Sequence, residues 1–141
     1  MSGLSEGLAV GDVVASSQVT LTRESLVRYA GASLDFNPIH YRDDVAKSVG
    51  LEGVLAHGML TMGLAISPVQ EWLGDRGVIT SYSVRFTKPV YVPADSGVVV
   101  EVSTSVWKLD DPEPGQLTLQ LAVTTGGASV LGKAQVVVSA S

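Results

Sequence analysis

One segment of the chain, from Gly58 to about Leu73, has apolar side chains on nearly every side of the helix that its spacing predicts. Its apolar members are Met59, Leu60, Met62, Leu64, Ala65, Ile66, Val69, Trp72 and Leu73. A helix that is apolar almost all round is typically buried, so we expect the rest of the chain to enclose it. Pro68 is expected to kink or tighten this helix, and Gly74 to cap its end.

After Gly74 the pattern changes to period two and β-branched residues, which predicts strands. The expected strands cover residues 78–87, 97–107, 116–125 and 129–139. The segment 110–115 contains two prolines and a glycine and predicts a turn, and Gly126-Gly127 predicts a tight hairpin. The second half of the chain should therefore form an antiparallel sheet.

The first half predicts shorter elements. We expect a strand over 17–21, a helix over 23–30 that Thr22 caps and Gly31 stops, a loop over 32–42, and a short helix from Asp43 or Asp44 to Gly50. Together these elements predict an α+β domain in which an antiparallel sheet wraps around the apolar helix. Residues 1–9 are expected to be a flexible leader and residues 10–141 a single domain.

Composition excludes several classes of function. The chain has 141 residues, a net charge of −5 and no basic run, so the sequence indicates no positively charged surface that would bind nucleic acid. No apolar run reaches the roughly 18 residues that span a bilayer, and the first residues do not resemble a signal peptide. With no cysteine in the chain, we expect a cytoplasmic protein without disulfides or Cys-ligated zinc. The mean hydropathy of +0.31 suggests that apolar surface is buried between subunits.

Scattered basic residues lie near the motifs described next. They are Arg42, Lys47, Arg85 and Lys88. Such a rim can receive a phosphate-bearing ligand or an acidic carrier protein, although ordinary solvated charge is the simpler explanation.

The segment Asp35-Phe36-Asn37-Pro38-Ile39-His40 places a carboxylic acid and an imidazole five residues apart. Pro38 disfavours helix at Asn37, so the segment bends and both groups can face one point. Such a pair suits proton transfer near neutral pH, and Asn37 can organise the loop through side-chain hydrogen bonds. The simpler alternative is an Asx turn beside a packed histidine.

The segment Ala56-His57-Gly58-Met59 lies where the buried helix begins. The backbone N–H of Gly58 can bind a carbonyl oxygen there, because a helix N-terminus has free donors and partial positive charge. The alternative is a glycine chosen only for its backbone angles. We interpret His57 as a structural histidine rather than a second base.

Together these two segments suggest proton transfer next to a carbonyl, coupled to gain or loss of water at the β carbon. We expect no metal site, since two histidines show no ligand spacing, and no cofactor. No glycine-rich nucleotide motif or serine-hydrolase motif occurs.

The run Tyr29-Ala-Gly-Ala-Ser-Leu-Asp35-Phe-Asn37-Pro38-Ile-His40, followed after five residues by Ala46, resembles the hydratase-2 motif of MaoC-like (R)-specific enoyl-thioester hydratases and dehydratases. The segments 56–59 and 84–90 resemble that family's helix entry and the strand that follows its helix. The hairpin Thr124-Thr125-Gly126-Gly127 and the length are similar to the β subunit of actinobacterial (3R)-hydroxyacyl-ACP dehydratase.

The resemblance implies a hotdog fold and a hydro-lyase that interconverts (3R)-3-hydroxyacyl and trans-2-enoyl thioesters of acyl carrier protein or CoA. It implies a catalytic dyad of Asp35 and His40, Asn37 as loop organiser, and the Gly58 N–H as oxyanion donor. It also implies a homodimer, or a heterodimer with a related hotdog subunit. Dehydration in acyl-chain elongation is the favoured role, and (R)-specific enoyl-CoA hydration in β-oxidation or polyhydroxyalkanoate precursor supply is the alternative.

Two further classes of function stay open from the sequence. One is an acyl-binding partner subunit of a heterodimeric dehydratase, and the other is a hotdog thioesterase, for which Glu71 is the only acid within the central helix. Three positions depart from the family pattern. They are Leu34 in place of the usual Gly, Ala94 in the common Pro-Gly-Asp, and Ile66 where some relatives place a polar residue.

Overall fold

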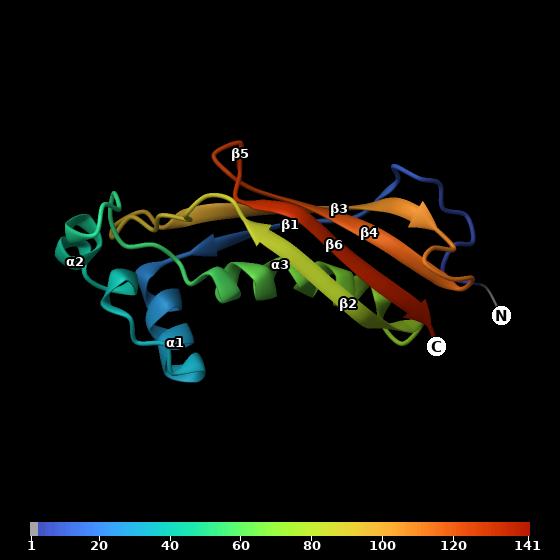
Figure 1. Ribbon diagram of the computed structural model, residues 1–141, viewed down its shortest axis with the longest axis horizontal. Helices are drawn as coiled ribbons and strands as arrows, with labels where there is room; N and C mark the ends of the chain where they lie inside the picture. The colour runs from blue at the N-terminus through green and yellow to red at the C-terminus, as the bar shows by residue number, and fades with distance from the viewer. Residues whose placement is uncertain (1–2) are drawn as a thin grey trace.

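The computed structural model describes residues 3–141 and consists of one antiparallel sheet and a long helix that lies along one of its faces (Figure 1). The elements in chain order are β1 (Val13–Leu21), α1 (Arg23–Ser33), η1 (Pro38–His40), α2 (Asp43–Ser48), α3 (Gly58–Leu73), β2 (Gly77–Phe86), β3 (Val98–Leu109), β4 (Gln116–Thr125), β5 (Ala128–Ser129) and β6 (Leu131–Ala140). The strands are ordered β1-β3-β4-β6-β2, and the short β5 pairs with β4. This is the α+β hotdog architecture that the sequence predicts.

The core lies between α3 and the face of the sheet that it covers. Alternate residues of β3, β4 and β6 point into it, as the period-two pattern requires. The helix contributes Ala65, Val69 and Leu73, which are spaced four residues apart and are all at most 3% exposed. Each large side chain buried in this way stabilises the fold by roughly 1.5–3 kcal/mol. Burial of α3 against the sheet therefore contributes to the stability of the fold.

The expectation that α3 is enclosed on every side is met along one face only. Met59 on the same helix is 60% exposed, and Met62, Leu64 and Ile66 are partly exposed. The helix continues through Pro68 without a break. The described chain thus leaves apolar side chains uncovered next to the start of α3.

Several boundaries differ from those predicted. Helix α1 does not stop at Gly31 but continues to Ser33, and Leu34 then adopts the left-handed conformation that ends it. The first strand begins at Val13 rather than Ser17, and the last expected strand is divided into β5 and β6. The hairpin at Gly126-Gly127 is confirmed, with both glycines at positive φ (55° and 81°).

The leader expected over residues 1–9 falls partly outside the described residues. Within the described part, Leu4 is 5% exposed and packs into the core. The boundary at residue 10 stays a prediction. In the described chain, no helix combines the length and apolar character needed to cross a membrane.

Helices α1 and α2 lie together at one end of the sheet, and the C-terminus lies at the other (Figure 1). The loop between α1 and α2 contains η1 and passes the beginning of α3. This arrangement brings the segment 35–40 next to residues 55–58.

Candidate active site

The loop between α1 and η1 is shaped by two short side chains. The Asp35 carboxylate accepts a hydrogen bond from the Asn37 N–H (3.2 Å), and the Asn37 side-chain oxygen accepts one from the Ile39 N–H (3.2 Å). Asn37 thereby caps η1, and Pro38 begins it. The Asx turn that is the simpler interpretation of segment 35–40 is therefore present, and it also directs His40 toward the interior.

His40 is 8% exposed and has one ring nitrogen fixed by the main chain. Its Nδ1 lies 2.7 Å from the carbonyl oxygen of Leu55. A carbonyl oxygen only accepts hydrogen bonds, so Nδ1 must carry the proton. Nε2 of the neutral ring is then the basic nitrogen.

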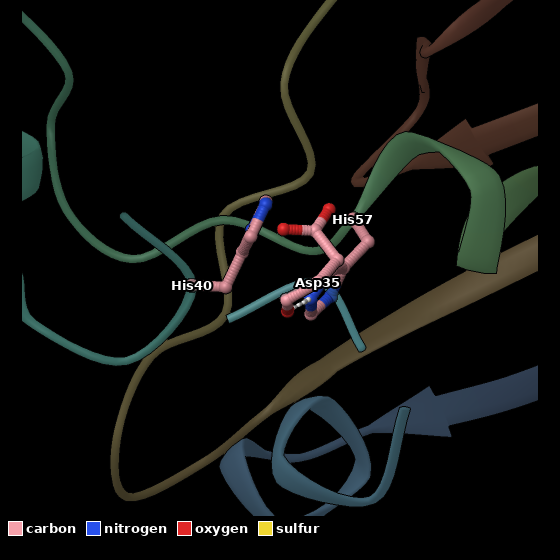
Figure 2. A group of neighbouring side chains, drawn as sticks. All are labelled: Asp35, His40 and His57. Carbon is pink, nitrogen blue, oxygen red and sulfur yellow. Dashed lines mark hydrogen bonds between the residues drawn. The ribbon is translucent and has the colours of Figure 1, made fainter. Parts of the chain in front are cut away.

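His57 lies at the N-cap of α3 and is 2% exposed. Its Nε2 lies 3.1 Å from the main-chain oxygen of Asp35, so this nitrogen is the donor (Figure 2). Its ring stacks on His40 with centroids 3.7 Å apart and planes inclined by 20°. Burial lowers the pKa of His57, and proximity to His40 lowers it further against the opposing influence of Asp35.

The acid and the two imidazoles therefore converge. One candidate atom from each of Asp35, His40 and His57 lies within 4.8 Å of the others. The carboxylate is on the exposed side of the group, and the imidazoles are on the buried side. An exposed acid beside a buried base that has a free lone pair can hold and exchange a proton.

The same three residues have the side-chain types of a metal site. However, one nitrogen of each imidazole already donates to a main-chain carbonyl, and the two rings are stacked face to face. The other nitrogen of each ring keeps its lone pair, so these bonds do not decide between a metal ligand and an acid/base role. The absence of a metal stays a prediction.

Gly58 follows His57 directly and borders a cavity of about 280 Å³. The cavity is lined by Leu55, Ala56, Gly58, Thr61, Phe86, Thr87, Lys88, Pro89, Val90, Val130 and Leu131. Gly58 is in the first turn of α3, where N–H groups have no preceding turn to bond, and His57 provides no side-chain cap. A carbonyl oxygen at this end of the cavity would meet free donors, which agrees with the expected role of Gly58 but does not test it.

Sequence reasoning missed two residues of this cavity. Phe86 packs over Gly58 so closely that a Cβ on Gly58 would lie 3.0 Å from the phenyl ring. Thr61 is 2% exposed, and its hydroxyl has no partner among the described residues. The spacing of Thr61, one turn after Gly58, was a usable signal, but nothing in the sequence located Phe86 at this position.

The expected basic rim is divided by the structure. Arg42 is paired with Asp44, and this pairing lowers the pKa of the Asp44 carboxyl. Lys88 borders the cavity, whereas Arg85 does not. Of the four basic residues, Lys88 is the one at the cavity.

The family model described as MaoC like domain matches residues 8–121. The chain belongs to this family. The MaoC-like protein is 30% identical to an (R)-specific enoyl-CoA hydratase of Rhodospirillum rubrum over 89% of this chain and 85% of the relative. It is also 37% identical to 3-hydroxyacyl-thioester dehydratase X of Mycobacterium tuberculosis, over 63% of this chain and 31% of that protein.

A solved structure of a MaoC-like dehydratase superposes on 96% of the chain with a TM-score of 0.87 and 34% identity. The superposition covers 42% of that protein. This MaoC-like chain thus spans less than half the length of some relatives and most of the length of others.

Proposed function

We propose that the protein is a hydro-lyase that interconverts (3R)-3-hydroxyacyl and trans-2-enoyl thioesters. The observation that carries this proposal is the convergence of Asp35 and His40 with His57, whose next residue, Gly58, borders a mainly apolar cavity. Relatives named as a hydroxyacyl-thioester dehydratase and an enoyl-CoA hydratase catalyse this type of reaction in its two directions.

In the dehydration direction, His40 Nε2 removes the α proton of the hydroxyacyl thioester. The Gly58 N–H donates to the thioester oxygen and stabilises the negative charge that develops there. Asp35 gives a proton to the 3-hydroxyl, the C–O bond breaks, and water leaves as the double bond forms. His40 then returns its proton to Asp35, which restores the starting state of the pair. Hydration follows the same steps in reverse.

The carrier is either acyl carrier protein or CoA, and both present a phosphorylated pantetheine arm. Lys88 at the border of the cavity is the basic residue best placed to meet its phosphate. Dehydration during acyl-chain elongation is our first choice of role. Hydration of enoyl-CoA in β-oxidation or polymer precursor supply is the second, and rates on matched CoA and carrier-protein substrates separate them.

A partner subunit that binds the acyl chain without catalysing is the alternative from another class. It is disfavoured because both Asp35 and His40 are present and face each other. The apolar surface near the site favours a dimer. Met59 and Phe86, next to Gly58 in sequence or in space, are each more than half exposed in the single chain. Light scattering of the purified protein distinguishes a homodimer from a monomer that awaits a different subunit.

The experiment is the loss of enoyl absorbance when the protein is mixed with crotonyl-CoA and longer enoyl thioesters. Asp35→Asn and His40→Ala should each reduce turnover by at least about 10²-fold, the scale of a positioned acid or base. Wild-type rates in either variant would refute the dyad. A folded dimer that is inactive on all enoyl thioesters would refute the function. A cytoplasmic location remains a prediction that cell fractionation checks.

A further inference from the structure

We infer that His57 is a positioning residue, a permanently neutral imidazole that fixes the Asp35 main chain and the His40 ring relative to the start of α3. This inference rests on the proposed function, because it concerns the same dyad. It revises the interpretation of His57 as merely a structural histidine at the helix start.

The first support is the hydrogen bond from His57 to the loop. Nε2 donates to the main-chain oxygen of Asp35 at 3.1 Å, across 22 positions of sequence. The bond holds the backbone of the acid, while the Asp35 carboxylate remains free of His57. Because Gly58 is the next residue, the same contact ties the loop to the proposed oxyanion donor.

The second support is the packing on the imidazole. The His40 ring stacks on the His57 ring with centroids 3.7 Å apart. The Tyr29 and His57 rings are in an edge-to-face arrangement, with centroids 4.8 Å apart and planes inclined by 62°. The His57 ring is thus held between α1 and η1 with 2% of its surface exposed. A ring packed in this way cannot rotate without moving His40, so it sets where the His40 ring lies.

The third support concerns charge. The groups that face His57 are Asp35 from the loop, His40 from η1 and Tyr29 from α1, and its own helix presents its positive end. In the described chain Nδ1 is buried without a hydrogen-bond partner. A second proton would therefore create a buried, unpaired donor beside the ring that receives the substrate proton.

The consequence is a division of labour between the two imidazoles of the chain. His57 remains neutral while His40 gains and loses a proton, so only one of two stacked rings is charged at any time. Misplacement of a reacting group by about 1 Å can reduce a rate by 10²-fold, so loss of this positioning should be visible in kcat.

Three variants test the inference in the full chain with crotonyl-CoA as the probe. His57→Phe keeps a ring for stacking and removes the donor, and His57→Gln keeps a donor at the position of Nε2 and removes the ring. Tyr82→Phe is the matched control, because it removes another side-chain donor to a main-chain oxygen (Tyr82 Oη to Met62 O, 2.7 Å) away from the dyad.

For His57→Phe we expect kcat to fall by at least about tenfold with KM changed less than about threefold, since positioning acts on the reacting groups rather than on substrate binding. His57→Gln should recover part of kcat, and Tyr82→Phe should retain the wild-type rate. Wild-type kcat in a folded His57→Phe protein would overturn the inference. Equal losses in the Phe and Gln variants would overturn the role of the hydrogen bond.

Nitrogen-15 NMR of the wild-type protein provides a test that does not depend on folding of a variant. The chain has two histidines, so its imidazole spectrum contains two rings. We expect one ring to remain neutral with its proton on Nε2 from pH 5 to 8, and the other to carry its neutral-form proton on Nδ1. If both rings become charged over this range, the inference fails even though the enzyme is active. An inactive wild-type protein would instead refute the proposed function.

Discussion

Replacing Leu34 with glycine should stabilise the protein, although it removes a large apolar side chain. Leu34 has φ 63° and ψ 21°, and its N–H donates to the Ala30 carbonyl at 2.8 Å to end α1. The left-handed conformation costs a residue with a Cβ roughly 1–2 kcal/mol. Leu34 is 76% exposed, so little burial opposes the change.

The larger backbone entropy of unfolded glycine offsets roughly 0.5–1 kcal/mol of this gain. The net stabilisation expected for Leu34→Gly is therefore about 0.5–1 kcal/mol, which raises Tm by roughly 1–4 °C for a chain of this size. Thermal unfolding followed by circular dichroism measures it. Leu34→Ala is the matched control, because it removes the same side chain but keeps the Cβ. The reasoning is refuted if the glycine variant melts no higher than the alanine variant.

Three further outcomes follow from contacts in the structure. Gly58→Ala should reduce turnover by at least about tenfold, because its Cβ would lie 3.0 Å from the Phe86 ring at the proposed oxyanion position. The control is the double variant Gly58→Ala/Phe86→Leu. If its turnover equals that of Phe86→Leu alone, Gly58 is required for packing against Phe86 and not for approach of the substrate. Asp43→Asn should destabilise the protein at pH 7, because hydrogen bonds from the Val54 N–H and then Arg23 lower the pKa of this carboxyl. That stabilisation is present above the unfolded pKa of 3.8 and is lost as pH falls through the pKa of Asp43 in the folded protein. The urea midpoints of the variant and the wild type should therefore converge at acidic pH. Burial lowers the pKa of His57 in the folded protein, so as pH falls the unfolded chain binds a proton at this residue before the folded chain does. The free energy of unfolding of the wild type should therefore decrease as pH drops below 6.5. A His57→Phe protein should lose less stability over the same range, and an identical pH dependence would contradict the assignment.

The sequence predicts best the parts of the fold in which apolar residues recur at a regular spacing. Helix α3 has the predicted bounds, because a nearly continuous apolar pattern ends at a glycine that caps it. Strand β4 also has the predicted bounds, because apolar residues at 117, 119, 121 and 123 alternate without interruption. The regular spacing of apolar residues is informative in these two elements because burial of one face requires it.

The end of α1 was predicted incorrectly for a physical reason. Gly31 has the residue type that usually ends a helix, but the chain continues for another turn and Leu34 adopts the strained conformation instead. The positive φ of Leu34 gives a physical reason for the glycine that the resemblance leads us to expect at this position. Sequence can identify which residues tolerate the left-handed region, but only the packed structure determines which residue must enter it.

For the site, the sequence indicated the residue types and the two segments, and the structure supplies the relation between them. Asp35 and His40 were predicted to face one point, and their atoms do converge. The stacking of His40 on His57 was not predictable, since no local pattern specifies how two loops 17 residues apart meet. Long-range placement of this kind depends on the whole core.

Segment 55–58 connects the core to the chemistry. Leu55 receives the hydrogen bond of His40 and forms a bridge with Tyr91, and His57 holds the Asp35 backbone. Each member of the proposed dyad is thus fixed to a different residue of one short segment, whose last residue, Gly58, begins α3. A shift of α3 along the sheet would carry the oxyanion donor, the base and the acid together and preserve their mutual geometry. Because segment 55–58 holds all three groups, substitutions in the core beneath α3 should reduce stability before they reduce the rate of the folded enzyme.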